Sequence, residues 1–101
     1  MAKLPAVYIL ASKKNATLYI GVTSDLVKRV WQHKSDLVKG FSKKYQVHRP
    51  AYFELHKSMR AAIIREKQLK KWERKWKLDL IESNNPNWLD LCLELIKKMD
   101  N

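Results

Sequence analysis

The sequence predicts a single domain spanning residues 1–101, of the α/β (α+β) class, with a small, mainly antiparallel, three-stranded sheet flanked by helices. Two short apolar segments, residues 7–10 and 18–22, are rich in aromatic and β-branched residues and are separated by a polar stretch, which is typical of a β-hairpin. A third segment, residues 51–56, alternates apolar and polar side chains with the period of a strand. Helical patterns fill most of the remaining chain and supply the helices that cover the sheet.

The hairpin carries one tyrosine on each strand. If its turn is centred near Lys13 and Lys14, the antiparallel register brings Tyr8 roughly opposite Tyr19, where cross-strand side chains on one face touch. We therefore expect two phenols to share one surface of the sheet.

The first helix is expected from about residue 24 to residue 38. Thr23 or Ser24 can cap it, and Asp25 places a favourable negative charge in its first turn. His33 lies within its apolar stripe, and Arg29 lies at the edge of that stripe, one turn earlier. A histidine on such a face is usually a core residue and a helical arginine is usually solvated, so the pattern alone assigns neither a function. The stripe consists of Leu26, Val30, His33 and Leu37.

A loop is expected over residues 39–49, where basic and aromatic side chains interleave. This mixture suits a surface that grips phosphates while it stacks bases. Phe41 and Tyr45 fit two roles equally well, as stacking residues or as plugs that hold the loop to the core. The basic residues expected to contact nucleic acid here are Lys43, Lys44 and Arg49.

The most basic segment, residues 58–82, is predicted to be helical, with Ser58 as its cap. A bend near residues 72–74 would split it into two helices. Its predicted apolar stripe is Ala62, Leu69, Trp72 and Trp76. Of the lysines and arginines that project elsewhere, those expected to contact nucleic acid are Lys70, Lys71 and Arg74.

Glu66 lies at the border of this buried stripe, beside Ala62 and Leu69, and away from most of the lysines. Two interpretations are open. The first is an ion pair with Lys70 in the favourable i,i+4 order, worth only a few tenths of a kcal/mol. The second is a metal ligand, a carboxylate held on a rigid helix that faces the tyrosines. The pattern alone favours the ion pair.

The C-terminal part begins with a turn, because Pro86 prevents the preceding helix from continuing. A closing helix is expected over residues 88–99, with packing as its role. Cys92 is the only cysteine of the chain and is expected to pack in the core.

Charge is the strongest compositional feature: 21 Lys and Arg stand against 10 Asp and Glu, for a formal net charge of +11. Such a charge on a small chain indicates a polyanionic partner, and nucleic acid is favoured over solubility alone. Neither a signal peptide nor a membrane-spanning run is present, so we expect a cytoplasmic protein and no membrane partner. With two glycines the chain holds no glycine-rich phosphate loop, and one cysteine with three scattered histidines offers no zinc site.

The ordered set of these motifs resembles the GIY-YIG nuclease family. It is closest to small single-domain bacterial members, related to the N-terminal domain of the excision-repair incision nuclease. The resemblance covers residues 4–91, and Val7 stands where the family name has glycine. The residues that carry it are Tyr8-Ile9, Tyr19-Ile20-Gly21, Arg29, His33, Glu66 and Asn85-Pro86-Asn87-Trp88.

The resemblance implies a metal-dependent endonuclease that hydrolyses phosphodiester bonds in DNA, with branched or damaged DNA in repair or recombination among its substrates. Glu66 would then hold a single Mg²⁺ or Mn²⁺, and Arg29 would clamp a phosphoryl oxygen. Tyr8 would be the general base, Tyr19 would orient water or phosphate, and His33 could relay the proton. A free phenol is a poor base at neutral pH, so Tyr8 would need a positive charge nearby.

Two other interpretations of the chain stay open. One is a noncatalytic nucleic-acid-binding module, and the other is a nuclease subunit that needs a protein partner for substrate recognition. The joint presence of Tyr8, Tyr19, Arg29 and Glu66 favours catalysis, because a binding module has no need of a carboxylate beside phosphate. DNA is favoured over RNA as the partner.

Overall fold

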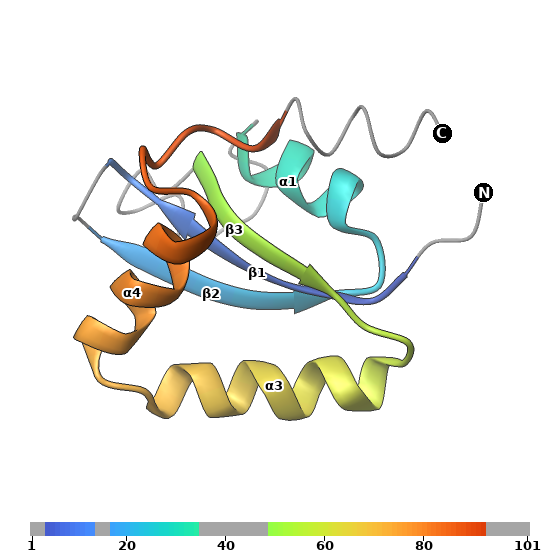
Figure 1. Ribbon diagram of the computed structural model, residues 1–101. Helices are drawn as coiled ribbons and strands as arrows, with labels where there is room; N and C mark the ends of the chain where they lie inside the picture. Colours follow the sequence, from blue (N-terminus) through green and yellow to red (C-terminus); the bar gives the residue numbers. More distant parts are fainter. Residues whose placement is uncertain (1–3, 14–16, 35–48, 93–101) are drawn as a thin grey trace.

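The computed structural model of the chain describes residues 4–13, 17–34 and 49–92, with residues 33 and 34 described by their backbone alone. Its elements form an α+β arrangement, which confirms the predicted fold class (Figure 1). In chain order they are β1 (Ala6–Ala11), β2 (Leu18–Thr23), α1 (Leu26–Lys34), β3 (Arg49–Leu55), α3 (Met59–Lys71) and α4 (Arg74–Asn84). Within these residues, none of the helices is long and apolar enough to span a bilayer.

The sheet has the order β2-β1-β3, and β1 pairs antiparallel with both neighbours. All six residues of β1 are buried, as expected for the middle strand of a sheet covered on both faces. The partner of the third strand, which the sequence left open, is therefore β1. A register irregularity between Ile9 and Leu10 marks a bulge in this pairing.

The register of the hairpin differs from the predicted one. Tyr8 pairs with Gly21, and Tyr19 pairs with Leu10, so the two tyrosines are diagonal neighbours, offset by two residues from the roughly opposite positions expected. The reason is that β1 continues to Ala11, which shifts the centre of the hairpin by one residue. Because side chains alternate with a period of two, a shift of two residues keeps both tyrosines on the same face. Their ring centroids lie 6.3 Å apart, so the shared surface forms as expected.

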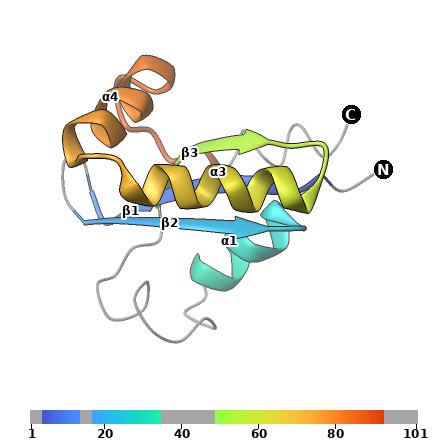
Figure 2. The ribbon, with the colours of Figure 1, turned by 90° about the horizontal axis from the view of Figure 1, so that it is seen from below.

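Helices cover both faces of the sheet. Figure 2 shows α3 running along the strands in front of the sheet, with α1 behind it. On the side of α3 and α4, the core contains Val7, Ile9, Ile20, Ala51, Ala62, Leu69, Ile81 and Trp88. On the side of α1, it contains Ala6, Tyr8, Leu10, Leu26 and Val30, with Tyr19, Phe53 and Cys92 packed against them. Cys92 thus packs against the core as expected.

The helix caps are set by local side-chain hydrogen bonds. In α1 the cap is Asp25, whose Oδ1 accepts from the backbone N–H of Lys28 at 3.3 Å, and not Thr23 or Ser24 as predicted. Thr23 Oγ1 accepts from the backbone N–H of Asp25 at 3.1 Å, which turns the chain so that the carboxylate can reach the helix. In α3 the predicted cap is confirmed, because Ser58 Oγ accepts from the backbone N–H of Ala61 at 3.1 Å.

The basic segment is split into two helices, as predicted, with the break at Trp72 and Glu73. Both residues have extended backbone conformations, which end α3 and start α4 in a new direction. The predicted apolar stripe does not survive this break, since Trp76 is 51% exposed. The fully buried residue of α4 is instead Ile81.

The segment after α4 covers the outer edge of β3. The backbone N–H of Leu91 donates to the carbonyl of Pro50 at 2.9 Å, and Asn85 Nδ2 donates to the carbonyl of Ala51 at 3.0 Å. Trp88 is fully buried and has a φ of 54°, so the predicted helix does not begin at this residue. Residues 93–99 of that prediction lie outside the described part of the chain.

Candidate active site

Tyr8 is positioned by the glycine opposite it. A Cβ placed on Gly21 would lie 2.9 Å from Cε2 of Tyr8 and closer still to its Cζ and Oη, inside van der Waals contact. The tyrosine ring therefore crosses β2 directly above Gly21, in space that any side chain would fill. This packing carries the phenol toward the β2 side of the sheet.

Tyr19 and Arg29 act on the same phenol. Burial and the neighbouring Tyr19, which also hydrogen-bonds to it, raise the pKa of Tyr8 well above its ordinary value. The charge of Arg29 lowers the pKa of Tyr8, but it does not offset the other causes. The protein alone therefore keeps Tyr8 protonated at neutral pH. Arg29 also lines a hollow of about 300 Å³ at the start of α1, together with Lys28 and Gln32.

Glu66 reaches this group from α3. Its charge is one of the causes that raise the pKa of Tyr8, which places the carboxylate within electrostatic range of the phenol. Oε2 of Glu66 lies 3.1 Å from Nζ of Lys70, so the expected i,i+4 ion pair is present. Lys70 in turn lines a cavity of about 300 Å³ beside Tyr19, together with Leu18, Ile20 and Lys77. Tyr8 and Tyr19 thus share one surface, with Arg29 and Glu66 within electrostatic range of the Tyr8 phenol.

The donor set at this position suits a metal shared with substrate. Among the described residues, no group of three or more His, Cys, Asp or Glu side chains converges to form a metal cage. A single carboxylate is nevertheless a common anchor for Mg²⁺, which keeps several waters and takes further ligands from substrate phosphates. Glu66 fits that role, and Lys70 is then the cation that balances its charge without the metal.

A network that the sequence analysis missed fixes the orientation of α3. The carboxylate of Glu54 accepts from Tyr52 Oη at 2.5 Å, from His56 Nε2 at 2.9 Å and from Arg65 Nε at 2.8 Å. Arg65 and Glu66 are consecutive on α3, so the bond from Arg65 to Glu54 also holds the turn of the helix that carries Glu66. A signal was present in the sequence, since Tyr52 and Glu54 alternate on β3 and His56 continues the alternation just after it, but only the fold brings Arg65 to them.

The charges of this network depend on one another. Although burial acts to raise the pKa of Glu54, its hydrogen bonds from Tyr52, Arg65 and His56 hold that pKa below the ordinary value. Burial, followed by the hydrogen bond to Glu54, raises the pKa of Tyr52 to about 12. Glu54 is therefore ionised and Tyr52 protonated at neutral pH.

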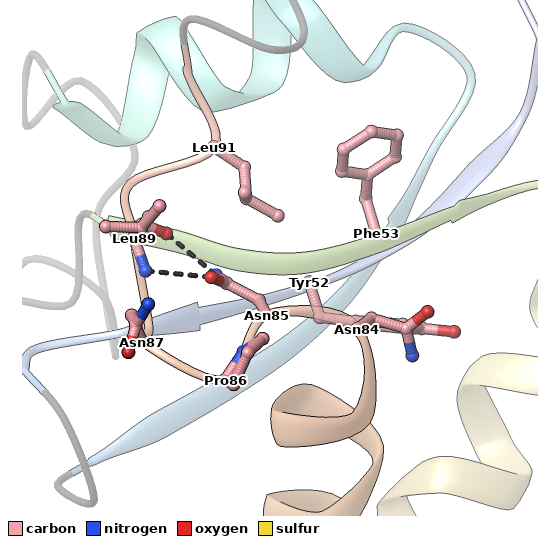
Figure 3. A pocket seen from close by; sticks show the side chains of 8 residues that line it. All are labelled: Tyr52, Phe53, Asn84, Asn85, Pro86, Asn87, Leu89 and Leu91. Carbon is pink, nitrogen blue, oxygen red and sulfur yellow. Dashed lines mark hydrogen bonds between the residues drawn. The ribbon is translucent and has the colours of Figure 1, made fainter.

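The asparagines at and after the end of α4 line part of a separate, uncharged pocket (Figure 3). Asn85 is buried and exchanges hydrogen bonds with the backbone of Leu89, at 2.9 Å to its carbonyl and 3.0 Å from its N–H. Asn84 bonds to the carbonyl of Leu80 at 3.0 Å. The pocket has a volume of about 410 Å³. Asn85 thus holds the segment after α4 to itself and to β3, whereas the bond of Asn84 to Leu80 stays within α4.

The remaining residues that were predicted to contact nucleic acid or to act in catalysis lie in different parts of the molecule. Arg49 donates to the carbonyl of Trp88 at 3.4 Å, at the β3 side of the sheet, whereas Lys71 and Arg74 are exposed where α3 meets α4. The backbone of His33 lies in α1. The side chain of His33, and Lys43 and Lys44, lie outside the described residues.

Comparison with known proteins gives two matches. The family model described as the GIY-YIG catalytic domain matches residues 4–79. The chain is also 35% identical over 79 residues to the UPF0213 protein CPE1444 of Clostridium perfringens, a match that covers 78% of this chain and 84% of that protein. No solved structure gives a significant match.

Proposed function

The chain belongs to the GIY-YIG nuclease domain family, and from this premise we propose that it is a metal-dependent endonuclease that hydrolyses phosphodiester bonds in DNA. The observation that carries the proposal is the grouping of Tyr8, Tyr19, Arg29 and Glu66. These residues come from both strands of the hairpin and from two helices on opposite faces of the sheet, yet Tyr19, Arg29 and Glu66 all act on the phenol of Tyr8.

Each side chain has a role that follows from its chemistry. Arg29 holds a phosphoryl oxygen, because a guanidinium offers several fixed donors to an anion. Tyr19 hydrogen-bonds to Tyr8 and orients the attacking water or the phosphate. His33, one turn after Arg29 in α1, relays the proton. Lys70 and Lys77 beside Tyr19 hold the flanking backbone of the nucleic acid.

Tyr8 is the proposed general base, and its surroundings define when it can act. Its raised pKa keeps the proton on the resting enzyme. Deprotonation therefore requires added positive charge at the site, which makes cleavage dependent on the bound cation. The closeness of Arg29 supports this assignment, because its charge already acts in the required direction.

Glu66 is the proposed holder of a single Mg²⁺ or Mn²⁺. Such a cation supplies Lewis-acid stabilisation of the negative charge that develops on phosphoryl and leaving oxygens. Glu66 sits on a helix whose orientation is held by the bond between Arg65 and Glu54. Its carboxylate is largely shielded, with 14% of the side chain exposed, and a lysine already neutralises it.

The proposed substrate is DNA rather than RNA, and branched or damaged DNA in repair or recombination agrees with the family premise. The net charge of +11 supports tight, salt-dependent binding to phosphates. A protein partner that directs the nuclease to its substrate is a further part of this proposal.

A noncatalytic nucleic-acid-binding module is the second candidate, and one observation favours it. The resting site is not activated, since Tyr8 is protonated and Glu66 is paired with Lys70. In that case the same fold and charge would bind nucleic acid without cutting it.

The test compares cleavage and binding for the wild type, Glu66→Gln and the control Glu73→Gln. Glu73 is exposed and makes no capping bond through its side chain. We expect metal-dependent cleavage of at least one substrate in a panel of branched, damaged and linear DNA and RNA. Glu66→Gln should lower it at least about a hundredfold, equivalent to about 3 kcal/mol, while Glu73→Gln should not.

The outcomes separate the two candidates. Glu66→Gln should bind DNA in chelator as well as the wild type or better, because a negative charge near the phosphates is gone. Cleavage by Glu66→Gln at the wild-type rate would remove this carboxylate from the mechanism. Absence of cleavage by the wild type on every substrate would favour the binding module.

A further inference from the structure

Trp76 is a large aromatic side chain that is not buried in the hydrophobic core. It lies in the first turn of α4 and is 51% exposed, although its spacing from Leu69 and Trp72 predicted burial. A single exposed apolar side chain needs no explanation by itself, but an exposed aromatic ring among cations has the composition of a surface on which bases stack. The chemistry around the ring identifies what that partner is.

The ring of Trp76 is held in a fixed position. It meets the half-buried ring of Trp72 edge to face, with 6.1 Å between centroids and 85° between planes. The guanidinium of Arg65 lies 5.1 Å from the centroid of Trp72, and Arg65 is itself bonded to Glu54. The chain of contacts from β3 to Trp76 therefore presents a supported aromatic surface to solvent.

Positive charge surrounds this ring. Residues 65–77 contain seven lysines and arginines and two glutamates. Lys71, Arg74 and Lys75 are exposed at the corner between α3 and α4. An apolar protein surface that covered the ring would leave this charge uncompensated, whereas a nucleic acid offers phosphates to the cations and bases to the ring.

We propose that Trp76 stacks on an unpaired base, so that the preferred ligand is nucleic acid with a single-stranded segment next to a duplex. Lys70 and Lys77 connect the two regions, because both line the cavity beside Tyr19 and Lys77 Nζ lies 3.5 Å from the carbonyl of Lys70. A strand that leaves the candidate active site over this cavity reaches the corner of α3 and α4, where Trp76 is exposed. Bases inside a duplex have no free face to offer, so stacking selects the unpaired segment.

This inference rests on the proposed function for its account of the substrate, but its test requires no cleavage. Binding is measured in chelator, by fluorescence anisotropy, for a fully paired DNA duplex and for the same duplex carrying a short unpaired flap. The proteins are the wild type, Trp76→Ala, Trp76→Phe and the control Trp31→Ala. Trp31 is 60% exposed and lies on α1, at the opposite face of the sheet, so it matches Trp76 in residue type and exposure.

We expect the wild type to prefer the flapped duplex. Trp76→Ala should weaken binding to it about tenfold, in line with the usual effect of losing one base-stacking aromatic, and should change duplex binding less than about twofold. Trp76→Phe should keep most of the preference, and Trp31→Ala should keep all of it. A thermal melt of each variant confirms that the fold is retained.

Three results would overturn the proposal: no preference in the wild type, equal losses on both DNAs in Trp76→Ala, or the same loss of preference in Trp31→Ala. The proposed nuclease activity fails by a different result, the absence of cleavage in metal, so the two ideas can be separated.

Discussion

Replacing Gly21 by alanine perturbs the proposed active site through a single methyl group. The added Cβ would lie 2.9 Å from Cε2 of Tyr8 and closer to its Cζ and Oη, whereas carbon atoms pack best at about 3.5–4.0 Å. Tyr8 is 2% exposed, so its ring has little free space to enter. The ring must move by about 1 Å, and its hydroxyl moves with it.

Two effects of opposite sign determine how much Gly21→Ala changes the free energy of unfolding. Overpacking of a buried site costs about 1–3 kcal/mol, while replacing glycine within a strand gains about 0.5–1 kcal/mol through the unfolded chain. We expect a net loss of about 1 kcal/mol, which lowers Tm by about 4–8 °C for a chain of this size. Displacement of Tyr8 by about 1 Å should lower cleavage about a hundredfold.

A double-mutant cycle isolates the contact. In a Tyr8→Leu background the shorter side chain leaves room for the methyl group, so Gly21→Ala should be neutral or stabilising by up to about 1 kcal/mol. Thermal and urea unfolding of the wild type, the two single variants and the double variant measure whether the effect of Gly21→Ala on stability changes sign. Equal destabilisation by Gly21→Ala in both backgrounds would show that the glycine is not required by the Tyr8 ring.

Three further predictions concern stability and binding. Glu54→Gln should destabilise the fold by about 1–3 kcal/mol, because three donors lose a charged acceptor. The lowered pKa of Glu54 contributes stability that is present above the ordinary glutamate pKa and is lost as the pH falls through the lowered pKa. The free energy of unfolding of this variant should therefore fall less steeply with acid than that of the wild type. Asn85→Ala should lower the free energy of unfolding in urea by about 1–3 kcal/mol, because buried backbone groups lose their partner. The same change at the exposed Asn84 should lower it by less than about 0.5 kcal/mol, and equal losses for the two variants would contradict this prediction. Replacing Lys70 and Lys71 by alanine should flatten the slope of log affinity against log salt by about one for each phosphate contact that is lost. DNA binding measured at several salt concentrations gives this slope, and an unchanged slope would show that the two lysines do not contact phosphates.

Local features of this chain could be predicted from its sequence. The strands of the hairpin, the Ser58 cap and the break near Trp72 depend on residues a few positions apart, where side-chain alternation, capping bonds and helix length act directly. The ion pair between Glu66 and Lys70 belongs to the same class, because one helical turn joins the two residues. The set of candidate site residues came from the resemblance of ordered motifs, since spacing alone assigned them no role.

The tertiary structure decided what depends on contacts between distant segments. The pairing of β3 with β1 and the bond from Arg65 to Glu54 join elements that the sequence left unconnected. The hairpin was predicted, but the passage of the Tyr8 ring over Gly21 depends on the register that the folded strands adopt. The raised pKa of Tyr8 follows from its burial and from its neighbours Tyr19 on β2 and Glu66 on α3, against the opposing charge of Arg29 on α1. Trp76 was predicted to be buried because a continuous helix would keep it in phase with Leu69, and the change of direction at Trp72 placed it in solvent instead. A periodic pattern specifies which side chains share a face only while the helix is unbroken, and the direction of the next helix is set by packing against the sheet.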